Sequence, residues 1–447
     1  MGILLDILYA AGLAVLSPVW GYRMIRHGRY REDIAQRFGA VPARYGLQPT
    51  IWVHGVSLGE VNAARTLIDA LHAQLPDYRV VVSTTTETGM AQAQKLYAPD
   101  HMVFRWPLDF TWAVGRALRR IRPELVVLME GEIWPNFLAA CNRSRVPVVL
   151  VNGRMSADKG YPRYRRLGPL AGRLFNRLTA VGVQHERYAE RFASLGAAPE
   201  KLRVTGMMKF DTAEVVDRID GQDALAAALG IDGDEPLVVA GGTGSDEEAL
   251  VLDAFAEVLS RHETARLALV PRKPERFDEV ARLVRDRNFA LARRRDHADG
   301  AASPHGRPPV ILGDTMGELR KFYALADAVF VGRSLVPAGG SDMIEAAALG
   351  KAVCFGPHTF NFPQADDMVA HGCVRVTDAD GLARRLSAWL DDPTAAAAAG
   401  AAAREYVRSQ QGATRRTVAM ICDVLGREPA VADGAMATPR IREDHDA

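Results

Sequence analysis

The chain has 447 residues, which is long for one domain and fits two domains of about 200 residues each. Hydrophobic residues make up 48% of it and charged residues 24%, the balance of a soluble globular enzyme. The formal net charge of +1 argues against a generally basic nucleic-acid-binding protein, so an anionic partner must be held by local clusters of positive charge. Four cysteines have neither zinc-finger nor redox-motif spacing, so we expect buried free thiols: Cys141, Cys354, Cys373 and Cys422.

Residues 3–22 are apolar apart from Asp6, and several arginines follow this stretch closely. About 20 apolar residues can just span a bilayer, and arginines on their C-terminal side keep the body of a protein in the cytoplasm. A cleaved signal peptide fits worse, because the start is not basic and no small-residue cleavage site is present. The alternative is an amphipathic helix, ended by Pro18, that lies on the membrane or packs on the protein. We predict a membrane anchor with a basic flank over residues 1–30. The sequence leaves open whether this segment spans the bilayer or lies on it.

From residue 50 onward, short apolar runs alternate with segments of helical spacing. Apolar runs bounded by turn residues are typical of strands buried on both faces, and their alternation with helices predicts parallel sheets. The first set of predicted strands is 51–54, 79–83, 125–129, 146–151 and 178–183. The second set, after a polar stretch that ends near residue 221, is 237–240, 266–270, 310–312, 328–331 and 352–355.

These two strand sets predict two Rossmann-like α/β domains. We expect the first domain at residues 31–215, the second at 216–425, and a polar, disordered tail at 426–447. Sheets of this type bind ligands beyond the C-terminal ends of their strands, so the loops that leave these strands should hold the chemistry.

The first predicted strand ends in residues 54–60, His-Gly-Val-Ser-Leu-Gly-Glu, and a helix begins at once. Gly55 and Gly59 allow a tight turn, and Ser57 can cap the helix so that backbone N–H groups point toward a ligand. Glu60 stands beside those donors, where a carboxylate can take a proton from an attacking hydroxyl as a general base. The alternative is that Glu60 only complements the helix dipole, as acids in first turns often do.

The strand at 125–129 leads into a segment, residues 129–136, that reads Met-Glu-Gly-Glu-Ile-Trp-Pro-Asn. Carboxylates such as Glu132 are costly at a strand exit unless they meet solvent or ligand, and Trp134 adds a surface for stacking a sugar. The alternative is a helix start with Pro135 in its first turn and acids before it. Arg154 and Arg163 follow the next strand and suit a phosphorylated lipid head group, but a solvated basic face explains them equally well.

In the second half, residues 240–248 form a Gly-rich strand-to-helix turn, suited to phosphate or to tight packing. The turn matches neither the Walker motif nor the dinucleotide fingerprint, which argues against an ATPase. Arg272 and Lys273 at another strand end could neutralise a leaving phosphate. Segments 314–318 and 339–345 each open a further helix, and Glu345 could hold ribose hydroxyls. Each signal alone is weak, but four at one end of a sheet favour a nucleotide pocket.

Taken together, these motifs resemble the 3-deoxy-D-manno-octulosonic acid (Kdo) transferase family of lipopolysaccharide biosynthesis, in the same order along residues 20–425. The segments that carry the resemblance are 54–60, 132–136, 152–156, 314–319 and 331–362. The family has the GT-B glycosyltransferase fold, with two Rossmann-like domains whose parallel sheets face a cleft, in agreement with the two strand sets. The resemblance implies that the N-terminal domain takes a lipid A precursor and the C-terminal domain takes CMP-Kdo.

Carried over to this chain, the resemblance implies that Glu60 is the catalytic base and that Glu132 and Lys209 support the transition state. It implies a single inverting displacement, in which Glu60 takes the proton of a glucosamine hydroxyl whose oxygen attacks the anomeric carbon of Kdo. The acceptor-side candidates are Ser57, Gly59, Arg154 and Arg163. The residues that match CMP-contacting segments are Pro271, Arg272, Met316, Gly317, Glu318, Asp342, Met343, Ile344 and Glu345.

The partners implied are CMP-Kdo as donor, a lipid A precursor and the bacterial inner membrane, with the catalytic domains on its cytoplasmic face. We expect no cofactor, metal ion or nucleic acid, because cations and helix N-terminal N–H groups can stabilise a leaving phosphate. Two alternatives stay open: a GT-B transferase that uses a different nucleotide sugar, and a non-catalytic scaffold at the membrane surface.

Three departures from the family pattern lie on the donor side. The family usually has Gly-Gly-Ser-Leu where residues 332–335 read Gly-Arg-Ser-Leu, and Gly-Gly-His-Asn where residues 339–342 read Gly-Gly-Ser-Asp. The turn at 242–248 also lacks a histidine that is common there. We predict that Arg333 pairs with Asp342 and so offsets the like charge that an aspartate brings near a phosphate. Because of these departures, the sequence constrains the identity of the donor sugar less than it constrains the assignment to the family.

Overall fold

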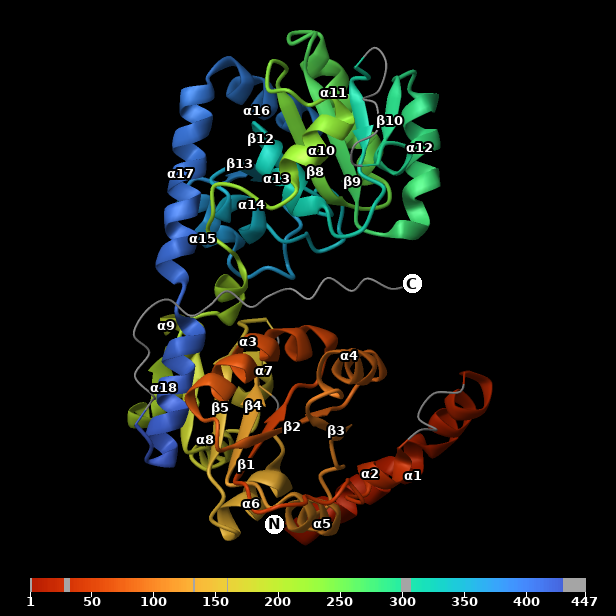
Figure 1. Ribbon diagram of the computed structural model, residues 1–447. Coiled ribbons are helices and arrows are strands. Elements are labelled where there is room, and N and C mark those ends of the chain that lie inside the picture. Colours follow the sequence, from red (N-terminus) through yellow and green to blue (C-terminus); the bar gives the residue numbers. More distant parts are fainter. Residues whose placement is uncertain (1, 28–32, 132, 159, 299–306, 429–447) are drawn as a thin grey trace. The chain divides into compact units, whose positions relative to one another are not determined.

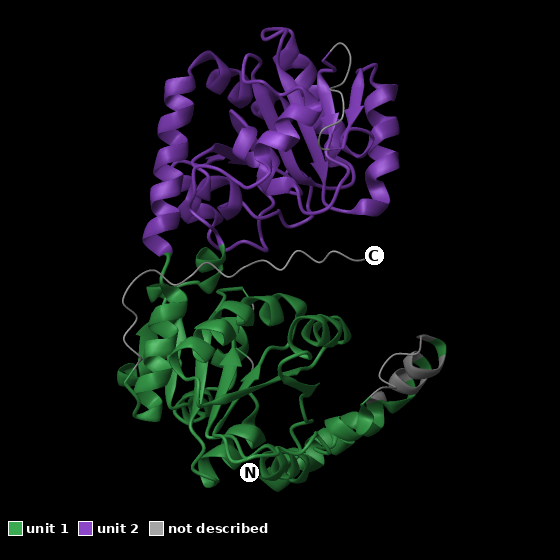
Figure 2. Ribbon diagram, in the orientation of Figure 1, with its two compact units in different colours: residues 1–212, 411–447 green, residues 213–410 purple. Residues whose placement is uncertain are grey.

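The computed structural model describes residues 2–27, 33–131, 133–158, 160–298 and 307–428. The chain divides into two compact units, which Figure 2 colours separately: unit 1 is residues 1–212 with 411–447, and unit 2 is residues 213–410. Each unit is built on a seven-stranded parallel sheet with helices on both faces, as the alternation of strands and helices predicts. The four cysteines are buried and unpaired, as predicted.

The unit 1 sheet has the strand order β3-β2-β1-β4-β5-β6-β7, and neighbouring strands run parallel. Val53 of β1 lies opposite Val82 of β2 and Val127 of β4. Successive side chains point to opposite faces, so Trp52 and Val53 enter the two separate cores that the helices cover. The strands are β1 (Thr50–His54), β2 (Arg79–Thr84), β3 (Met102–Arg105), β4 (Leu125–Met129), β5 (Val148–Gly153), β6 (Ala180–Val183) and β7 (Leu202–Val204).

The last helix of the chain, α18, packs on unit 1 against α3, β5, β6 and the 3-10 helix η2. The range 216–425 expected for the second domain therefore includes a helix of unit 1, because the apolar face of α18, with Val418 and Ile421, is buried in the unit 1 core. The helices of unit 1 are α1 (Gly2–His27), α2 (Ile34–Arg37), α3 (Leu58–Gln74), α4 (Glu87–Tyr97), α5 (Thr111–Ile121), α6 (Pro135–Arg143), α7 (Gly160–Arg165), α8 (Pro169–Phe175), α9 (Glu186–Ser194), η1 (Pro199–Lys201), η2 (Met208–Thr212) and α18 (Ala413–Leu425).

Helix α1 continues through Pro18, so the proline does not end it as the sequence suggested. Proline has no N–H to donate to the carbonyl four residues earlier, and here the Ser17 hydroxyl donates to that carbonyl, of Ala14, at 2.8 Å. Among the described residues, no helix is long and apolar enough to cross a membrane.

Helix α1 is fastened to unit 1 through its acidic residue, Asp6, and lies against α5 and α6 (Figure 1). The carboxylate of Asp6 accepts hydrogen bonds from Thr111 N at 2.9 Å and from Asn136 Nδ2 at 3.0 Å. The Tyr9 hydroxyl donates to Asp109 at 3.2 Å, and Asp109 in turn accepts from the first N–H groups of α6. These contacts fix where α1 leaves the sheet domain.

The unit 2 sheet has the strand order β10-β11-β9-β8-β12-β13-β14, again with parallel neighbours. Its strands are β8 (Leu237–Thr243), β9 (Arg266–Pro271), β10 (Leu291–Arg293), β11 (Val310–Leu312), β12 (Ala328–Val331), β13 (Ala352–Phe355) and β14 (Val374–Arg375). Its helices are α10 (Gln222–Leu229), α11 (Glu247–Leu259), η3 (Pro274–Arg276), α12 (Phe277–Asp286), η4 (Arg294–Asp296), α13 (Leu319–Leu325), α14 (Ile344–Ala348), α15 (Ala365–Ala370), α16 (Ala379–Asp391) and α17 (Pro393–Gln410).

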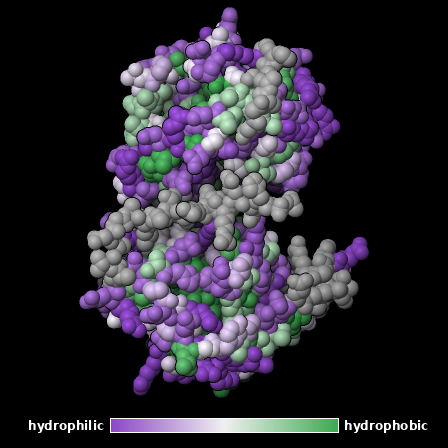
Figure 3. All heavy atoms as spheres, in the orientation of Figure 1, coloured by the Kyte–Doolittle hydropathy of each residue, from purple (hydrophilic) through white to green (hydrophobic). Residues whose placement is uncertain are grey.

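The surface of the described residues is mostly polar. On the face drawn in Figure 3, hydrophilic side chains cover most of each unit and hydrophobic ones appear in small groups. A more concentrated set of exposed apolar side chains lies on α1, at Ile3, Leu4, Ile7, Leu8 and Val15. This helix is therefore the part of unit 1 whose surface differs from that of a globular enzyme.

Candidate active site

In each sheet the chain order reverses beside the first strand, since β1 lies between β2 and β4, and β8 lies between β9 and β12. Loops that leave two such strands go to opposite faces and open a crevice beyond the strands' C-terminal ends, where open α/β sheets bind ligands. The predicted site residues of unit 1 follow β1, β4, β5 and β7. Those of unit 2 are Pro271, the last residue of β9, and residues that follow β9, β11 and β12.

Glu60 is held by a capping box at the start of α3. Ser57 is the N-cap: its Oγ accepts from Glu60 N at 3.3 Å and donates to Glu60 Oε1 at 3.0 Å. The N–H of Val56 donates to Oε2 of Glu60 at 2.9 Å. Glu60 therefore does have a structural role at the start of α3, which the sequence left open as the alternative to catalysis. The same bonds fix the carboxylate at the C-terminal end of β1, which is where a base needs a defined position.

Strained backbone marks the ends of β4 and β5 beside this loop. Glu130 has φ 60° and Asn152 has φ 51°, in the left-handed region that costs L-residues about 1 kcal/mol or more. The two strand ends are tied together, because Glu130 N donates to Val151 O and Arg154 N donates to Glu130 O, both at 2.9 Å. Strain of this kind concentrates at functional sites.

Lys209 and Arg154 surround Glu130 with positive charge. Burial raises the pKa of the Glu130 carboxyl, while the charges of Arg154 and Lys209 oppose the rise. Lys209 lies in η2 between the buried side chains of Met208 and Phe210, and η2 packs against α3, the helix that carries Glu60. The structure thus gathers Glu130, Arg154 and Lys209 at the C-terminal edge of the unit 1 sheet.

The remaining unit 1 candidates are placed differently. Glu132 lies outside the described residues. Arg163 is exposed on α7, and its guanidinium lies 5.6 Å from the centre of the Tyr164 ring. Gly59 is exposed, and a Cβ there would meet only Ser57 Oγ at 3.8 Å, so the local packing would accept alanine.

His54, which ends β1, is a neutral core residue. Its ring stacks on Trp106 with 3.8 Å between ring centres, and its Nδ1 lies 3.0 Å from the carbonyl oxygen of Ser83. Burial lowers the pKa of His54 to about 3, against a smaller opposing effect of that carbonyl. His54 therefore does not supply a proton at neutral pH, and it shapes the base of the loop that holds Glu60.

In unit 2 the loop after β12 is clamped by Glu247, which is fully buried at the start of α11. Its carboxylate accepts hydrogen bonds from the backbone N–H groups of Arg333, of Ser334 at 2.8 Å and of Leu335 at 2.9 Å. Burial raises the pKa of Glu247, and the three N–H groups oppose that rise. A second tie joins the segment before α14 to β8, where Ser341 Oγ donates to Gly242 O at 2.7 Å.

Replacing Glu247 with glutamine is expected to lower the free energy of unfolding by about 2–3 kcal/mol, because an amide cannot accept all three buried N–H groups as a carboxylate does. Urea unfolding followed by circular dichroism measures the change. Glu257→Gln, an exposed position on the same helix, is the matched control and should shift stability by less than about 0.5 kcal/mol. Equal stability of the two variants would contradict the clamp.

The predicted donor-side residues after β9 and β11 lie at the C-terminal edge of the unit 2 sheet. Arg272 follows Pro271, its side chain is exposed, and its N–H donates to Thr243 O at 3.1 Å. Met316 is 68% exposed and Gly317 has φ 84°, a turn conformation that favours glycine. Both residues can therefore present backbone groups to a ligand.

Glu318, next in this turn, is held by Arg294. The guanidinium donates to its carboxylate from Nε at 2.8 Å and from Nη2 at 3.0 Å. Burial alone would raise the pKa of Glu318, but hydrogen bonds from Arg294 and Thr315 bring it below its usual range. The carboxylate of Glu318 thus fixes the turn that presents Met316 and Gly317.

At the start of α14, the side chains of Met343 and Ile344 are buried in the core, so only their backbone groups can reach a ligand. Asp342 and Glu345 are half-buried, and Asp342 Oδ1 accepts from Ile344 N at 3.0 Å. The predicted pairing of Arg333 with Asp342 is wrong. Arg333 Nη2 instead donates to Ala338 O at 2.9 Å, because the stem of Arg333 extends over the turn after β8.

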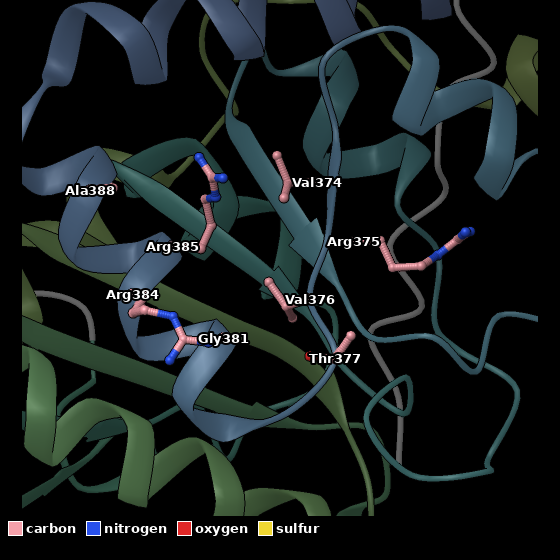
Figure 4. Close-up of a pocket in the computed structure, with 8 residues that line it drawn as sticks. All are labelled: Val374, Arg375, Val376, Thr377, Gly381, Arg384, Arg385 and Ala388. Atoms are coloured by element: carbon pink, nitrogen blue, oxygen red, sulfur yellow. The ribbon is translucent and has the colours of Figure 1, made fainter.

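A separate pocket lies at the sheet edge, between β14 and α16 (Figure 4), and two of its arginines have partners in the protein. Arg375 pairs with Asp366 at 2.8 Å, and the Arg385 guanidinium lies 5.5 Å from the centre of the Trp389 ring. Its lining residues are Val374, Arg375, Val376, Thr377, Gly381, Arg384, Arg385 and Ala388. Among the described residues, no group of three or more His, Cys, Asp or Glu side chains could hold a metal ion.

Sequence reasoning missed several residues of this arrangement as site candidates. Glu130 and Asn152 stood in the quoted segments, but their strain depends on φ angles that a sequence does not show. Glu247 was interpreted only as part of a Gly-rich turn, and its three backbone partners lie more than 80 residues away. The available signal was a pair of acids, Glu247 and Glu248, shortly after a glycine-rich turn.

Two units, each a parallel sheet covered by helices on both faces, are the architecture of the GT-B fold. A glycosyltransferase from Rickettsia africae has this fold, with a TM-score of 0.55 at 12% identity, over 86% of this chain and 100% of that chain. At such low identity, the likeness shows the fold alone.

The family follows from more similar sequences. The model of the family described as 3-deoxy-D-manno-octulosonic-acid transferase (kdotransferase) matches residues 32–212. The 3-deoxy-D-manno-octulosonic acid transferase of Bordetella pertussis is 36% identical over 93% of this chain and 97% of its own length. The enzyme of the same name from Haemophilus influenzae is 31% identical over 94% of this chain and 98% of its own. The chain belongs to the Kdo transferase family.

Proposed function

We propose that the protein transfers Kdo from CMP-Kdo to a hydroxyl of a lipid A precursor, with Glu60 as the general base. The observation that carries this proposal is the position of Glu60 in a chain of the Kdo transferase family. Its carboxylate is fixed by Ser57 and Val56 beside the point where the strand order of unit 1 reverses. A base held in one geometry at a ligand crevice suits proton removal from a positioned hydroxyl.

In the proposed reaction, Glu60 takes the proton of a glucosamine hydroxyl as its oxygen attacks the anomeric carbon of Kdo. The bond from that carbon to the phosphate oxygen of CMP breaks, and the configuration inverts. Arg272 supplies positive charge for the phosphate that leaves, and backbone N–H groups at Met316 and Gly317 add to it. Lys209 is retained from the family resemblance as a group that supports the transition state. Cations and N–H groups fill these roles, so the proposal needs neither a metal ion nor another cofactor.

The acceptor side is proposed to use the groups of unit 1. Arg154 lies beside Glu130 and Lys209, and Arg163 is exposed on α7, so both can meet the phosphates of a lipid head group. Glu132, outside the described residues, is retained as a further catalytic candidate on the strength of the family resemblance.

The test is transfer by the purified full-length protein from CMP-Kdo to a lipid A precursor, followed by mass spectrometry of the lipid and by release of CMP. A lipid product heavier by Kdo, formed with stoichiometric CMP, supports the proposal. Absence of product with binding of CMP retained would overturn it in favour of a different nucleotide sugar, which the altered residues Arg333, Ser341 and Asp342 and the altered turn at 242–248 make the second candidate. Absence of CMP binding as well would favour the membrane-surface scaffold.

We also propose that α1 holds the enzyme on the cytoplasmic face of the inner membrane, where a lipid acceptor is accessible. The support is an exposed apolar stripe, with Ile3 at 77% and Leu4 at 71% exposure, on a helix that Asp6 fastens to unit 1. Trp112, on the neighbouring helix α5, is 52% exposed, and tryptophan favours the membrane interface. A fastened helix with one apolar side suits binding parallel to the membrane surface.

Replacing Ile3, Leu4, Ile7 and Leu8 together with glutamine is expected to weaken binding to phosphatidylethanolamine–phosphatidylglycerol vesicles at least about tenfold, because apolar burial is lost. Co-sedimentation with vesicles measures the effect, and transfer to a detergent-dispersed acceptor should stay within about twofold of wild type. The matched control replaces Leu47 and Val204, which are exposed outside α1. Unchanged vesicle binding by the α1 variant would remove this role.

A further inference from the structure

Two arginines flank the C-terminal end of β8, in the middle of the unit 2 sheet. Arg272 directly follows β9 and Arg333 follows β12, and β8 lies between these two strands. Both loops are attached to the end of β8: Arg272 N donates to Thr243 O at 3.1 Å, and Gly332 N donates to Gly241 O at 2.9 Å. The two side chains therefore start on opposite sides of the turn at residues 243–246.

The backbone of Arg333 is in a conformation that favours glycine. Its φ is 59°, in the left-handed region, and the Glu247 carboxylate holds the N–H groups of Arg333 and Ser334. Because this clamp acts on the main chain alone, glycine at position 333 would fit the loop without strain. The fold thus gives no reason for an arginine, and a strained residue at a ligand crevice points to a functional one.

The stem of Arg333 covers Gly244. A Cβ on Gly244 would lie 3.0 Å from Cγ and 3.7 Å from Cδ of Arg333, and no other heavy atom outside the adjacent residues lies within 4 Å of that position. The φ of Gly244 is outside the left-handed region, so the backbone itself would accept a side chain there. Gly244 and Arg333 are therefore complementary, since the absence of a side chain on one loop makes room for the arginine of the other.

Two charged groups act on the guanidinium of Arg333, and they are Arg272 and Glu247. Burial lowers the pKa of Arg333, and the positive charge of Arg272 lowers it further, while Glu247 acts in the opposite direction. The carboxylate of Glu247 is already used by three backbone N–H groups. In the described part of the chain, neither Arg272 nor Arg333 forms an ion pair with an acid, and the Arg333 guanidinium donates to a carbonyl, that of Ala338.

An unsatisfied hydroxyl lies at the same turn. Thr243 is the last residue of β8, its side chain is buried, and its Oγ1 has no hydrogen-bond partner within the described residues. Buried hydroxyls normally have a partner, so the packing at this turn leaves one polar group unsatisfied. An anionic group beside the turn could bind both guanidinium groups.

We propose that Arg333, with Arg272, binds an acidic group of the donor, either the phosphate of the nucleotide or the carboxylate of the sugar, and that Gly244 is small so that the arginine can reach it. This inference rests on the proposed function for the identity of the donor. Arginine suits the task because its planar guanidinium can bind two oxygens of a phosphate or carboxylate at once.

The test compares wild type with Arg333→Gly by calorimetric binding of CMP and of cytidine, and by the KM for CMP-Kdo. We expect Arg333→Gly to weaken CMP binding about tenfold or more, the value of a lost charged hydrogen bond, and to leave cytidine binding and the thermal midpoint no lower than wild type. An effect on the KM for CMP-Kdo without one on CMP assigns Arg333 to the sugar carboxylate. Changes below twofold in both would overturn the inference.

Gly244→Ala in both backgrounds tests the complementarity. In wild type the new methyl group displaces the Arg333 stem, so CMP binding should weaken as in Arg333→Gly, whereas in the Arg333→Gly background it should have no further effect. Equal additional losses in both backgrounds would contradict the pairing. If wild type binds neither CMP nor CMP-Kdo, the proposed function fails. If wild type binds and transfers while Arg333→Gly matches it, only this inference fails.

Discussion

Glutamine in place of Glu60 is expected to lower kcat for Kdo transfer by about 100- to 10,000-fold while leaving the fold intact, because it removes the base and keeps the cap. An amide oxygen can still accept the Val56 N–H, and Ser57 Oγ can still cap the helix by accepting Glu60 N. The measurement is single-turnover transfer from CMP-Kdo to a lipid A precursor, alongside thermal unfolding and CMP binding.

Ser57→Ala is the matched control for this variant. It removes the N-cap hydroxyl and is expected to cost about 1 kcal/mol of stability, with far less loss of transfer than Glu60→Gln. A large kcat loss in Glu60→Gln with CMP binding retained supports the base. If both variants lose activity in proportion to their loss of stability, the capping role alone explains Glu60 and the catalytic role is withdrawn.

The strands that the sequence predicted best are the long central ones. The predicted range 125–129 is β4 itself, and the first strand begins one residue earlier than predicted, at Thr50. These strands are buried on both faces, so their apolar runs are continuous and end at turn residues. The short edge strands β3, β7, β10 and β14 were not predicted, because runs of two to four residues give little pattern to detect.

The place of α18 depended on a long-range contact that the sequence pattern does not contain. Asp211 caps this helix, with its carboxylate accepting from Gly412 N at 2.6 Å and Thr414 N at 2.5 Å, about 200 residues along the chain. This packing also affects the site. Gln411 donates to Phe210 O at 3.2 Å, so the C-terminal part of the chain, where it rejoins unit 1, holds the segment that contains Lys209. Sequence reasoning found Lys209 by family resemblance and could not find what holds it.

The predicted site residues came from strand ends, and the structure places those that it describes at the C-terminal edges of the two sheets, because parallel strands end at one edge. What the sequence could not show is which side chains are already used. Glu318 is bound by Arg294, and the side chains of Met343 and Ile344 are in the core, so only the backbone and the geometry of these three positions are available to a ligand. A motif gives the residues of a site, while their partners come from elements that are distant in sequence.

Methionine in place of Lys209 is expected to lower kcat by about 100- to 1,000-fold, the usual effect of removing one group that stabilises developing negative charge. The measurement is again single-turnover transfer, with Lys209→Arg as the charge-preserving control, which should retain more activity than the methionine variant. Full activity in Lys209→Met would exclude a role for this cation in the transfer step.

The same variant should change how stability depends on pH, through Glu130. Burial raises the folded-state pKa of Glu130 and Lys209 opposes the rise, so removing the lysine raises that pKa further. A carboxyl whose pKa is higher in the folded than in the unfolded protein binds more protons when folded, so stability falls as pH rises between the two pKa values. Lys209→Met should therefore lose more stability than wild type as pH rises through that window, and Lys209→Arg should not. If the two variants have the same pH dependence of urea unfolding, Glu130 and Lys209 are not coupled, and the charge cluster at the end of β4 does not act as a unit.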